Sequence, residues 1–128
     1  MLAAAAVVAC ALNLLGRSQP IAPIKLLSTR PPEASPSAEA FVTRDPPTIY
    51  LITSTAAFDD ARSETANRLD GCRKVASIIV HEEWHLQHGA DEQGAYYAQI
   101  TALSAMGASP VQISDVRRAM FAVLRTPR

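Results

Sequence analysis

A five-residue segment, HEEWH, places two imidazoles four residues apart, at His81 and His85, with a carboxylate directly after the first. The preceding run, residues 75–80, has five apolar side chains in six and no charge, which predicts a buried helix leading into the motif. Residues four apart share one face of a helix, so both imidazoles can point at one metal ion. Zn²⁺ suits such a site, because two imidazoles and a carboxylate can bind it and leave a fourth position for water.

Glu82 is the residue that turns a metal site into a possible catalyst. On a helix it projects about 100° round from His81, which puts its carboxylate beside the metal rather than on it. A carboxylate in that position can act as a general base on a water molecule. The alternative is a solvated helix surface, but buried imidazoles and carboxylates need partners, and this favours the metal site. The chemistry implied is hydrolysis of an amide.

Local signals delimit the helices that must position these groups. The metal-binding helix is expected over residues 73–88, because Gly89 suits a left-handed cap at its end. Asp91 is a plausible N-cap of a second helix that runs to about residue 106, where Gly107 stops it. A third helix follows from the sequence SPVQ at Ser109, which matches a capping box with proline at the first helical position. The apolar stripe of that third helix consists of Ile113, Val116, Met120 and Val123.

A catalytic zinc site needs a third protein ligand, and Glu92 is the preferred candidate. On the second helix Glu92 shares a face with Tyr96 and Gln99, so a turn at Gly89 that folds this helix back brings its carboxylate towards the imidazoles. Asp91 is the alternative, because it lies only six residues beyond the second histidine. Its competing role is that of the N-cap.

His88 is a weaker alternative for the third ligand. It lies near the face of His81 and His85, but three ligands along one straight helix cannot easily converge on one ion. An outer or solvent-exposed role is expected for it.

The segment from His81 to Tyr96, with the pattern HExxH followed by ExxAY, resembles the gluzincin metallopeptidases, in which a glutamate on a following helix completes a two-histidine zinc site. It is also similar to small bacterial zincins such as the immunity-repressor (ImmA/IrrE-like) peptidases. The resemblance covers residues 75–103 and implies a zinc-dependent peptidase. Two departures are a short gap between His85 and Glu92 and the single strand evident before the motif. That strand, residues 48–53, could be the edge strand that binds substrate in a zincin.

The resemblance also implies a mechanism. Zinc activates a water, Glu82 takes its proton and passes it to the leaving amine, and Tyr96 can donate a hydrogen bond to the oxyanion. For Tyr96, a core aromatic with a satisfied hydroxyl is an equal alternative. Gln99 could support a ligand or be an ordinary interior polar residue.

A different class of function is a noncatalytic envelope protein with a structural zinc site, because a short folded region gains stability from a metal. Glu82 argues against it, since a structural site has no use for a carboxylate beside the metal. A metal-free helical interaction module would leave the imidazoles and carboxylates unexplained.

Composition limits the partners. The chain has 128 residues, with 12 basic and 12 acidic side chains, so it has no net charge to recruit nucleic acid or an anionic membrane. The expected partner is a peptide or protein substrate.

The N-terminal segment predicts export. Residues 2–15 form an apolar run interrupted only by Asn13, which is too short to span a bilayer, where about 20 residues are needed. Residues 1–16 are therefore expected to be a signal peptide or N-terminal membrane anchor, with a packed helix as the alternative. A secreted or envelope location is predicted, and the segment before Cys10 resembles a lipobox, which would make the protein a lipoprotein through Cys10. Cys72 would then be unpaired, as a small buried residue.

Residues 17–47 contain seven prolines and no amphipathic period, which predicts a linker. The folded domain is expected over residues 48–128, with residues 59–70 mainly loop. The overall expectation is an α+β, mainly helical, minimal zincin-like domain with one or two strands, the HExxH helix, a glutamate helix and a C-terminal helix.

Overall fold

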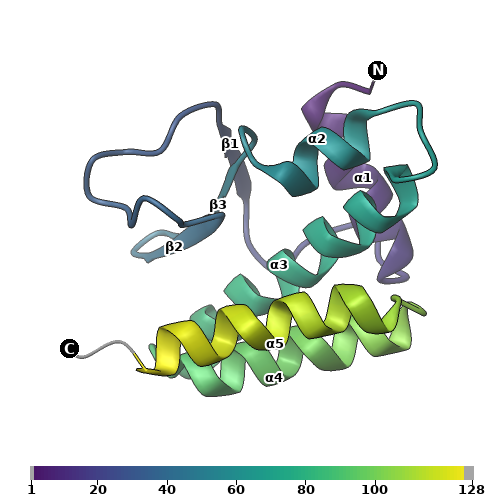
Figure 1. Cartoon of the computed structure of the whole chain (residues 1–128). Helices are drawn as coiled ribbons and strands as arrows, with labels where there is room; N and C mark the ends of the chain where they lie inside the picture. The colour runs from purple at the N-terminus through teal and green to yellow at the C-terminus, as the bar shows by residue number, and fades with distance from the viewer. Residues whose placement is uncertain (1, 126–128) are drawn as a thin grey trace.

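The computed structural model describes residues 2–125 and confirms a mainly helical α+β fold (Figure 1). In that part of the chain five helices accompany one three-stranded sheet, so there are more strands than the one or two expected. In chain order the elements are α1 (Ala4–Leu14), β1 (Ile24–Leu27), β2 (Ala40–Arg44), β3 (Pro47–Ile52), α2 (Ala56–Arg62), α3 (Arg68–His88), α4 (Glu92–Ala105) and α5 (Pro110–Arg125).

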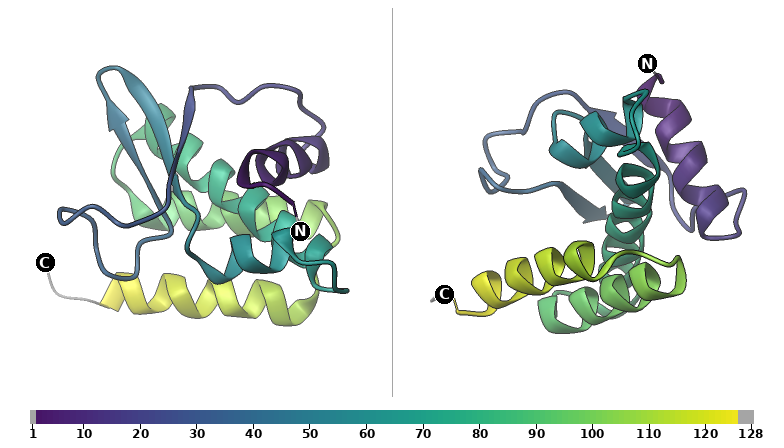
Figure 2. Two further views of the ribbon diagram at one scale, coloured as in Figure 1. Left: turned by 90° about the horizontal axis from the view of Figure 1, so that it is seen from above. Right: turned by 45° about the vertical axis from the view of Figure 1, so that its right-hand side comes forward.

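Helix α3 is the central element and carries the HExxH motif. It packs against α1, α2, α4 and the sheet, and Figure 2 shows α1 and the sheet on different sides of it. Helix α4 runs back along α3, and α5 packs antiparallel on α4 (Figure 1). Helix α3 therefore connects the site at its C-terminal end to the sheet and to the other helices.

Helix α3 begins at Arg68, five residues before the expected start at residue 73, and α2 occupies part of the segment expected to be loop. Close packing of small residues explains this extra helical structure. A Cβ on Gly71 would lie 2.2 Å from the backbone nitrogen of Ala61, so α2 and α3 approach each other more closely than a side chain at position 71 would allow. Polar composition alone did not reveal this contact, because it depends on the absence of one side chain.

The sheet has the order β1-β3-β2, with β1 parallel and β2 antiparallel to the central strand β3. The expected strand at residues 48–53 is thus the central strand, and the edge strand on the side of α3 is β2. Residues 17–47, expected to be a linker, supply both outer strands. Prolines flank these strands rather than interrupt them, which is the position that proline tolerates next to a sheet.

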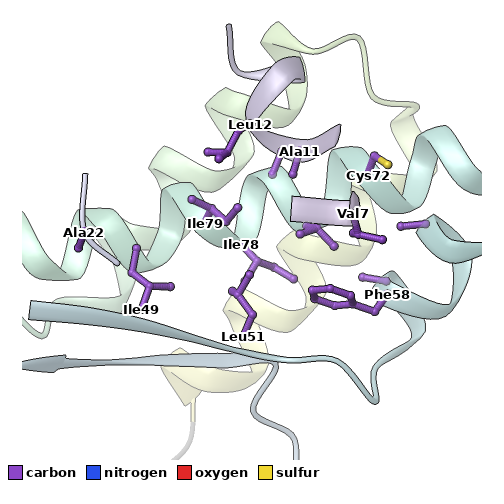
Figure 3. Close-up of a cluster of buried hydrophobic side chains, with 14 residues drawn as sticks. Val7, Ala11, Leu12, Ala22, Ile49, Leu51, Phe58, Cys72, Ile78 and Ile79 are labelled. Atoms are coloured by element: carbon purple, nitrogen blue, oxygen red, sulfur yellow. The ribbon is translucent and has the colours of Figure 1, made fainter. Parts of the chain in front are cut away.

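The buried core joins the N-terminal helix to the rest of the chain (Figure 3). Val7 and Ala11 of α1 have no exposed surface, and they belong to the same cluster as Phe58 of α2 and Ile79 of α3. Residues 1–16 therefore include the packed helix that was the alternative to a signal peptide. Among the described residues, no helix has the length and apolar character required to cross a membrane.

The two cysteines are linked by a disulfide between Cys10 of α1 and Cys72 of α3. The prediction of an unpaired Cys72 was wrong, although the residue is fully buried as expected. It failed because Cys10 was assigned to a removable segment, whereas α1 packs beside α3. A bonded Cys10 also has no thiol to carry a lipid, which argues against the predicted lipoprotein.

Candidate metal centre

The turn between α3 and α4 brings the candidate ligands together. Helix α3 ends at Gly89, which has a φ of +100° and a ψ of −157°, a backbone conformation that favours glycine but is not left-handed helical. Only three residues separate the two helices, so α4 folds back along α3. Glu92, the first residue of α4, consequently lies next to His81 and His85, and the ligand atoms of these three residues all lie within 4.8 Å of one another.

One carboxylate oxygen is shared by the two imidazoles. Oε1 of Glu92 is 3.2 Å from Nε2 of His81 and makes a still shorter contact with Nε2 of His85. Two ring nitrogens and one carboxylate oxygen therefore point at a common centre. This is a donor set that could hold a divalent cation such as Zn²⁺.

The two alternative ligands lie outside this cluster. The Asp91 side chain caps α4, as predicted, by accepting a hydrogen bond of 3.1 Å from the backbone N–H of Gln93. His88 is exposed, stacks on Trp84 with ring centroids 4.5 Å apart, and has its Nδ1 3.2 Å from the carbonyl oxygen of Trp84. Of the candidate ligands, the structure brings together only His81, His85 and Glu92 within its described residues.

The remaining ring nitrogens also have partners. Nδ1 of His85 lies 2.7 Å from the carbonyl oxygen of Gly89, so the residue that ends α3 also orients the second histidine. Nδ1 of His81 lies 2.8 Å from Oε1 of Gln99, which is buried. Gln99 lies on the same face of α4 as Glu92 and Tyr96, two turns after the first and one turn after the second. Both imidazoles are thereby orientated with Nε2 towards the common centre.

The charges in the cluster favour an ionised carboxylate. Hydrogen bonds to the two imidazoles, with the larger effect from His81 and the next largest from His85, lower the pKa of Glu92 to about 2. The reciprocal bond to Glu92 raises the pKa of His85 above its usual value. In the absence of a metal, the carboxylate and the imidazoles thus compensate one another's burial.

Glu82 lies next to the candidate ligands without belonging to their set. It is 7% exposed, and its Oε2 is 4.0 Å from Nε2 of His81. Burial raises the pKa of the Glu82 carboxyl, partly offset by attraction to His81. A carboxylate at this distance can contact a molecule bound at the centre.

Tyr96 packs edge-on against His81, with ring centroids 4.6 Å apart and an interplanar angle of 84°. Burial raises the pKa of the Tyr96 phenol to about 12, with a smaller contribution from Glu92. The phenol therefore keeps its proton at neutral pH and can act as a hydrogen-bond donor in the cleft.

These groups line a cleft of about 450 Å³ between α3, α4, α5 and the edge strand β2. On one side is β2, including Ala40 and Val42, and on another is α5, with Val116 and Val123. His81, Glu82, His85, Glu92 and Tyr96 all line this cleft. The candidate site is thus accessible from solvent and bordered by a strand edge.

Glu83, the residue after the candidate base, is buried and fully paired. Its carboxylate accepts hydrogen bonds of 2.8 and 2.6 Å from the guanidinium of Arg17 and one of 3.1 Å from the N–H of Ile21. The segment that follows α1 is therefore bound to α3 within the HExxH motif. No local sequence pattern indicates this contact, because Arg17 and Glu83 are 66 positions apart.

No protein-family model matches the sequence, and no significant match was found among curated proteins or solved structures.

Proposed function

We propose that this protein is a zinc-dependent hydrolase that cleaves peptide bonds, with His81, His85 and Glu92 as metal ligands and Glu82 as general base. The observation that carries the proposal is the convergence of two imidazole nitrogens and one carboxylate oxygen within 4.8 Å, with a second, buried carboxylate beside them. Their position in an open cleft is what a hydrolase requires.

The donor set fits zinc. Two imidazoles and one carboxylate are a known set of protein ligands for a catalytic zinc, and they leave one position for water or substrate. When bound, the ion would lower the pKa of a water molecule and polarise the carbonyl group of the substrate. The remaining steps depend on side chains of the chain itself.

Glu82 is placed to move the proton. Its carboxylate accepts one proton from the attacking water, whose oxygen forms the new bond to the carbonyl carbon. The same carboxyl then gives that proton to the amide nitrogen as the C–N bond breaks, which restores Glu82. Tyr96 supplies a hydrogen-bond donor for the oxygen that gains negative charge, since its phenol stays protonated at neutral pH.

The edge strand β2 supports a peptide substrate. It pairs with β3 along one edge only, and its residues Ala40 and Val42 line the cleft. An extended peptide can add to such an edge through main-chain hydrogen bonds. This would place a scissile carbonyl beside the residues of α3.

A noncatalytic protein with a structural zinc site is the second candidate function. The cluster lies at the hinge of the α3–α4 pair, where a bound ion would hold two helices together. Glu82 favours the hydrolase, because a structural site gains nothing from a buried carboxylate that is not a ligand.

The deciding experiment uses the full chain loaded with zinc and a diverse peptide library. Glu82→Gln keeps the shape and the three ligands but removes the proton acceptor, so cleavage should fall by about 10²–10⁴-fold. Zinc content and thermal midpoint should stay at the wild-type value. Glu33→Gln, in an exposed loop, is the matched control and should keep full activity.

Two results would contradict the proposal. Loss of zinc in Glu82→Gln would make this residue a ligand or a structural group. A zinc-loaded wild-type chain that cleaves no peptide, together with a silent Glu82→Gln, would leave only the structural zinc site.

A further inference from the structure

One cation that lines the cleft has no acidic partner. Arg44, the last residue of the edge strand β2, borders the cleft together with Ala40 and Val42. Alternate residues of a strand point to the same face, so these three side chains form one row along the cleft. No carboxylate among residues 2–125 forms an ion pair with Arg44. Its positive charge is therefore available to a ligand.

The charge of the cleft is different at its two ends. At one end, Nζ of Lys74 lies 3.6 Å from Oε1 of Glu39, so this second cation of the cleft is paired. At the other end, Nη2 of Arg44 donates a hydrogen bond of 2.7 Å to the carbonyl oxygen of His85. Strand β2 thus runs alongside α3, from Lys74 towards His85. The unpaired cation lies at the end that carries the candidate metal ligands.

The hydrogen bond to His85 orients Arg44 and uses little of its donor capacity. The carbonyl oxygen of His85 already accepts the N–H of Gly89 at 2.9 Å, so the end of α3 does not depend on Arg44 for a partner. A guanidinium has several N–H donors in a planar fork, and the bond to His85 occupies one nitrogen. The remaining donors match the two oxygens of a carboxylate.

An extended peptide on the free edge of β2 would bring a group to these donors. In such a pairing, side chains on the same face of adjacent strands lie next to each other, and opposite charges across the strands attract. The peptide residue beside Arg44 would also lie beside His85. The carboxylates of Glu82 and Glu92 line the same cleft, so an anionic group needs a compensating cation to bind there.

We propose that Arg44 is a specificity-determining residue that binds a carboxylate of the peptide substrate close to the cleaved bond. This carboxylate is the C-terminal group of a short peptide or the side chain of an acidic residue, which present the same two oxygens. The effect on cleavage rests on the proposed function. The carboxylate site itself can be measured as binding, without a metal.

The first measurement is cleavage by the zinc-loaded full chain of two matched pairs of peptides. One pair has the same sequence with a free C-terminal carboxylate or a C-terminal amide. The other pair is amidated and has glutamate or glutamine next to the cleaved bond. In one pair, the carboxylate member should have a kcat/KM about tenfold higher, mainly through KM, because a charge-assisted bidentate contact is formed. The pair that shows this preference identifies the source of the carboxylate.

Variants of Arg44 test whether this residue causes the preference. Arg44→Met keeps the apolar stem and removes the charge, so the two members of the pair should then be cleaved equally well. Arg44→Lys keeps the charge without the planar fork and should retain part of the preference. Lys25→Met is the matched control, because Lys25 is exposed on β1 at the opposite edge of the sheet. A merely structural role for Arg44 would slow the cleavage of both members alike and lower the thermal midpoint.

The second measurement uses the zinc-free full chain, in which no metal can bind the carboxylate. The probes are acetyl-trialanine and its C-terminal amide, and acetylated, amidated tripeptides with a central glutamate or glutamine, each titrated by NMR. A carboxylate peptide should bind more tightly than its neutral counterpart, and added salt should weaken this binding because the ion pair is screened. Arg44→Met should remove both the difference and the dependence on salt.

The proposal is overturned if neither pair shows a preference for the carboxylate, or if the preference persists in Arg44→Met. Cleavage that is intact but equal for all four peptides would reject the role of Arg44 and leave the peptidase function. A wild-type chain that cleaves none of them, but binds a carboxylate peptide through Arg44, would retain the carboxylate site and reject the peptidase function.

Discussion

Two neighbouring carboxylates, Asp91 and Glu92, have opposite roles, although either could be a zinc ligand by spacing alone. Asp91 has an extended backbone, with a φ of −67° and a ψ of 104°, and its side chain bends to the N–H of Gln93. Glu92 is already helical, and its side chain reaches Nε2 of both His81 and His85. A difference of one residue at a helix start thus separates a cap from a candidate ligand.

The first prediction compares these two carboxylates. Glu92→Ala removes a proposed ligand. It should weaken zinc binding by more than about 100-fold, which is the upper end of the effect of losing a residue that only hydrogen-bonds a ligand. Asp91→Ala removes only the cap, so it should lower the free energy of unfolding by about 1 kcal/mol and leave the zinc Kd nearly unchanged. Chelator competition and urea denaturation measure the two effects. The reverse order of zinc affinities would make Asp91 the ligand.

The second prediction concerns the histidines. The full chain should bind one zinc ion, and His81→Ala and His85→Ala should each abolish this stoichiometry, because each removes an imidazole from the cluster. His88→Ala is the control, since His88 is exposed and stacks on Trp84 outside it. Metal analysis after gel filtration checks the outcome, and retention of zinc in both cluster variants would end the metal-site interpretation.

At the scale of elements, the geometry of the site depends on how closely α4 packs on α3. A Cβ on Gly94 would lie 2.2 Å from Cζ2 of Trp84, so the indole of α3 fills the space left by the missing side chain. Trp84 directly precedes His85, and Gly94 lies two residues after Glu92, so this contact determines the spacing of the two helices beside the candidate ligands.

The third prediction tests this spacing. Glycine to alanine inside an ordinary helix stabilises by up to about 1 kcal/mol. Gly94→Ala should instead destabilise by about 1–3 kcal/mol, because the new methyl group overlaps the indole. Zinc affinity should fall as well, since Glu92 is carried by the displaced helix.

A double variant provides the control for Gly94→Ala. Trp84→Leu removes the ring that the methyl group meets, so Gly94→Ala should cost much less in that background. Urea denaturation of the four proteins in the cycle measures the coupling. Stabilisation by Gly94→Ala in the wild-type background would show that the helices do not pack this closely.

At the scale of the molecule, the N-terminal segment is part of the domain. Helix α1 contributes to the core, a disulfide joins it to α3, and Arg17 pairs with Glu83 behind the motif. A domain restricted to residues 48–128 would lack α1 and two of the three strands. The disulfide also supports the proposal of export, since disulfides persist mainly in oxidising compartments.

The fourth prediction concerns this disulfide. It joins residues 62 apart in sequence, and the chain-entropy model gives such a link about 4 kcal/mol of stabilisation. Reduction of the wild type should lower the free energy of unfolding by that order, as measured by urea denaturation. The double variant Cys10→Ala/Cys72→Ala is the control, and a reductant should not change its stability. An equal stability of the oxidised and reduced wild type would mean that the bond adds nothing to the fold.

The fifth prediction is that the fragment of residues 48–128 does not fold alone. It would expose Ile49 and Ile79, which are fully buried against residues of α1 and the sheet in the whole chain. Circular dichroism should show no cooperative thermal transition for the fragment, in contrast to the full chain. A cooperative transition with zinc bound would mean that residues 1–47 are dispensable.

Local features of the sequence determined four helix boundaries and the face of α4 that carries the candidate ligand. Gly89, Asp91, Gly107 and Ser109 mark helix boundaries that the structure places within a residue of those expected, because capping depends on groups within one turn. The common face of Glu92, Tyr96 and Gln99 followed from helical periodicity in the same way.

The tertiary structure alone decided which distant segments meet. Strand β2 lies at the site although its sequence reads as a proline-rich linker, and Cys10 and Arg17 reach α3 from a segment that reads as a signal peptide. The disulfide joins residues 62 positions apart, and Arg17 and Glu83 are 66 positions apart. No local periodicity or capping pattern can therefore predict these contacts. They form because burying the apolar face of α1 and the two outer strands against α3 and β3 offsets the conformational entropy lost on ordering them, a balance that only the packed chain determines.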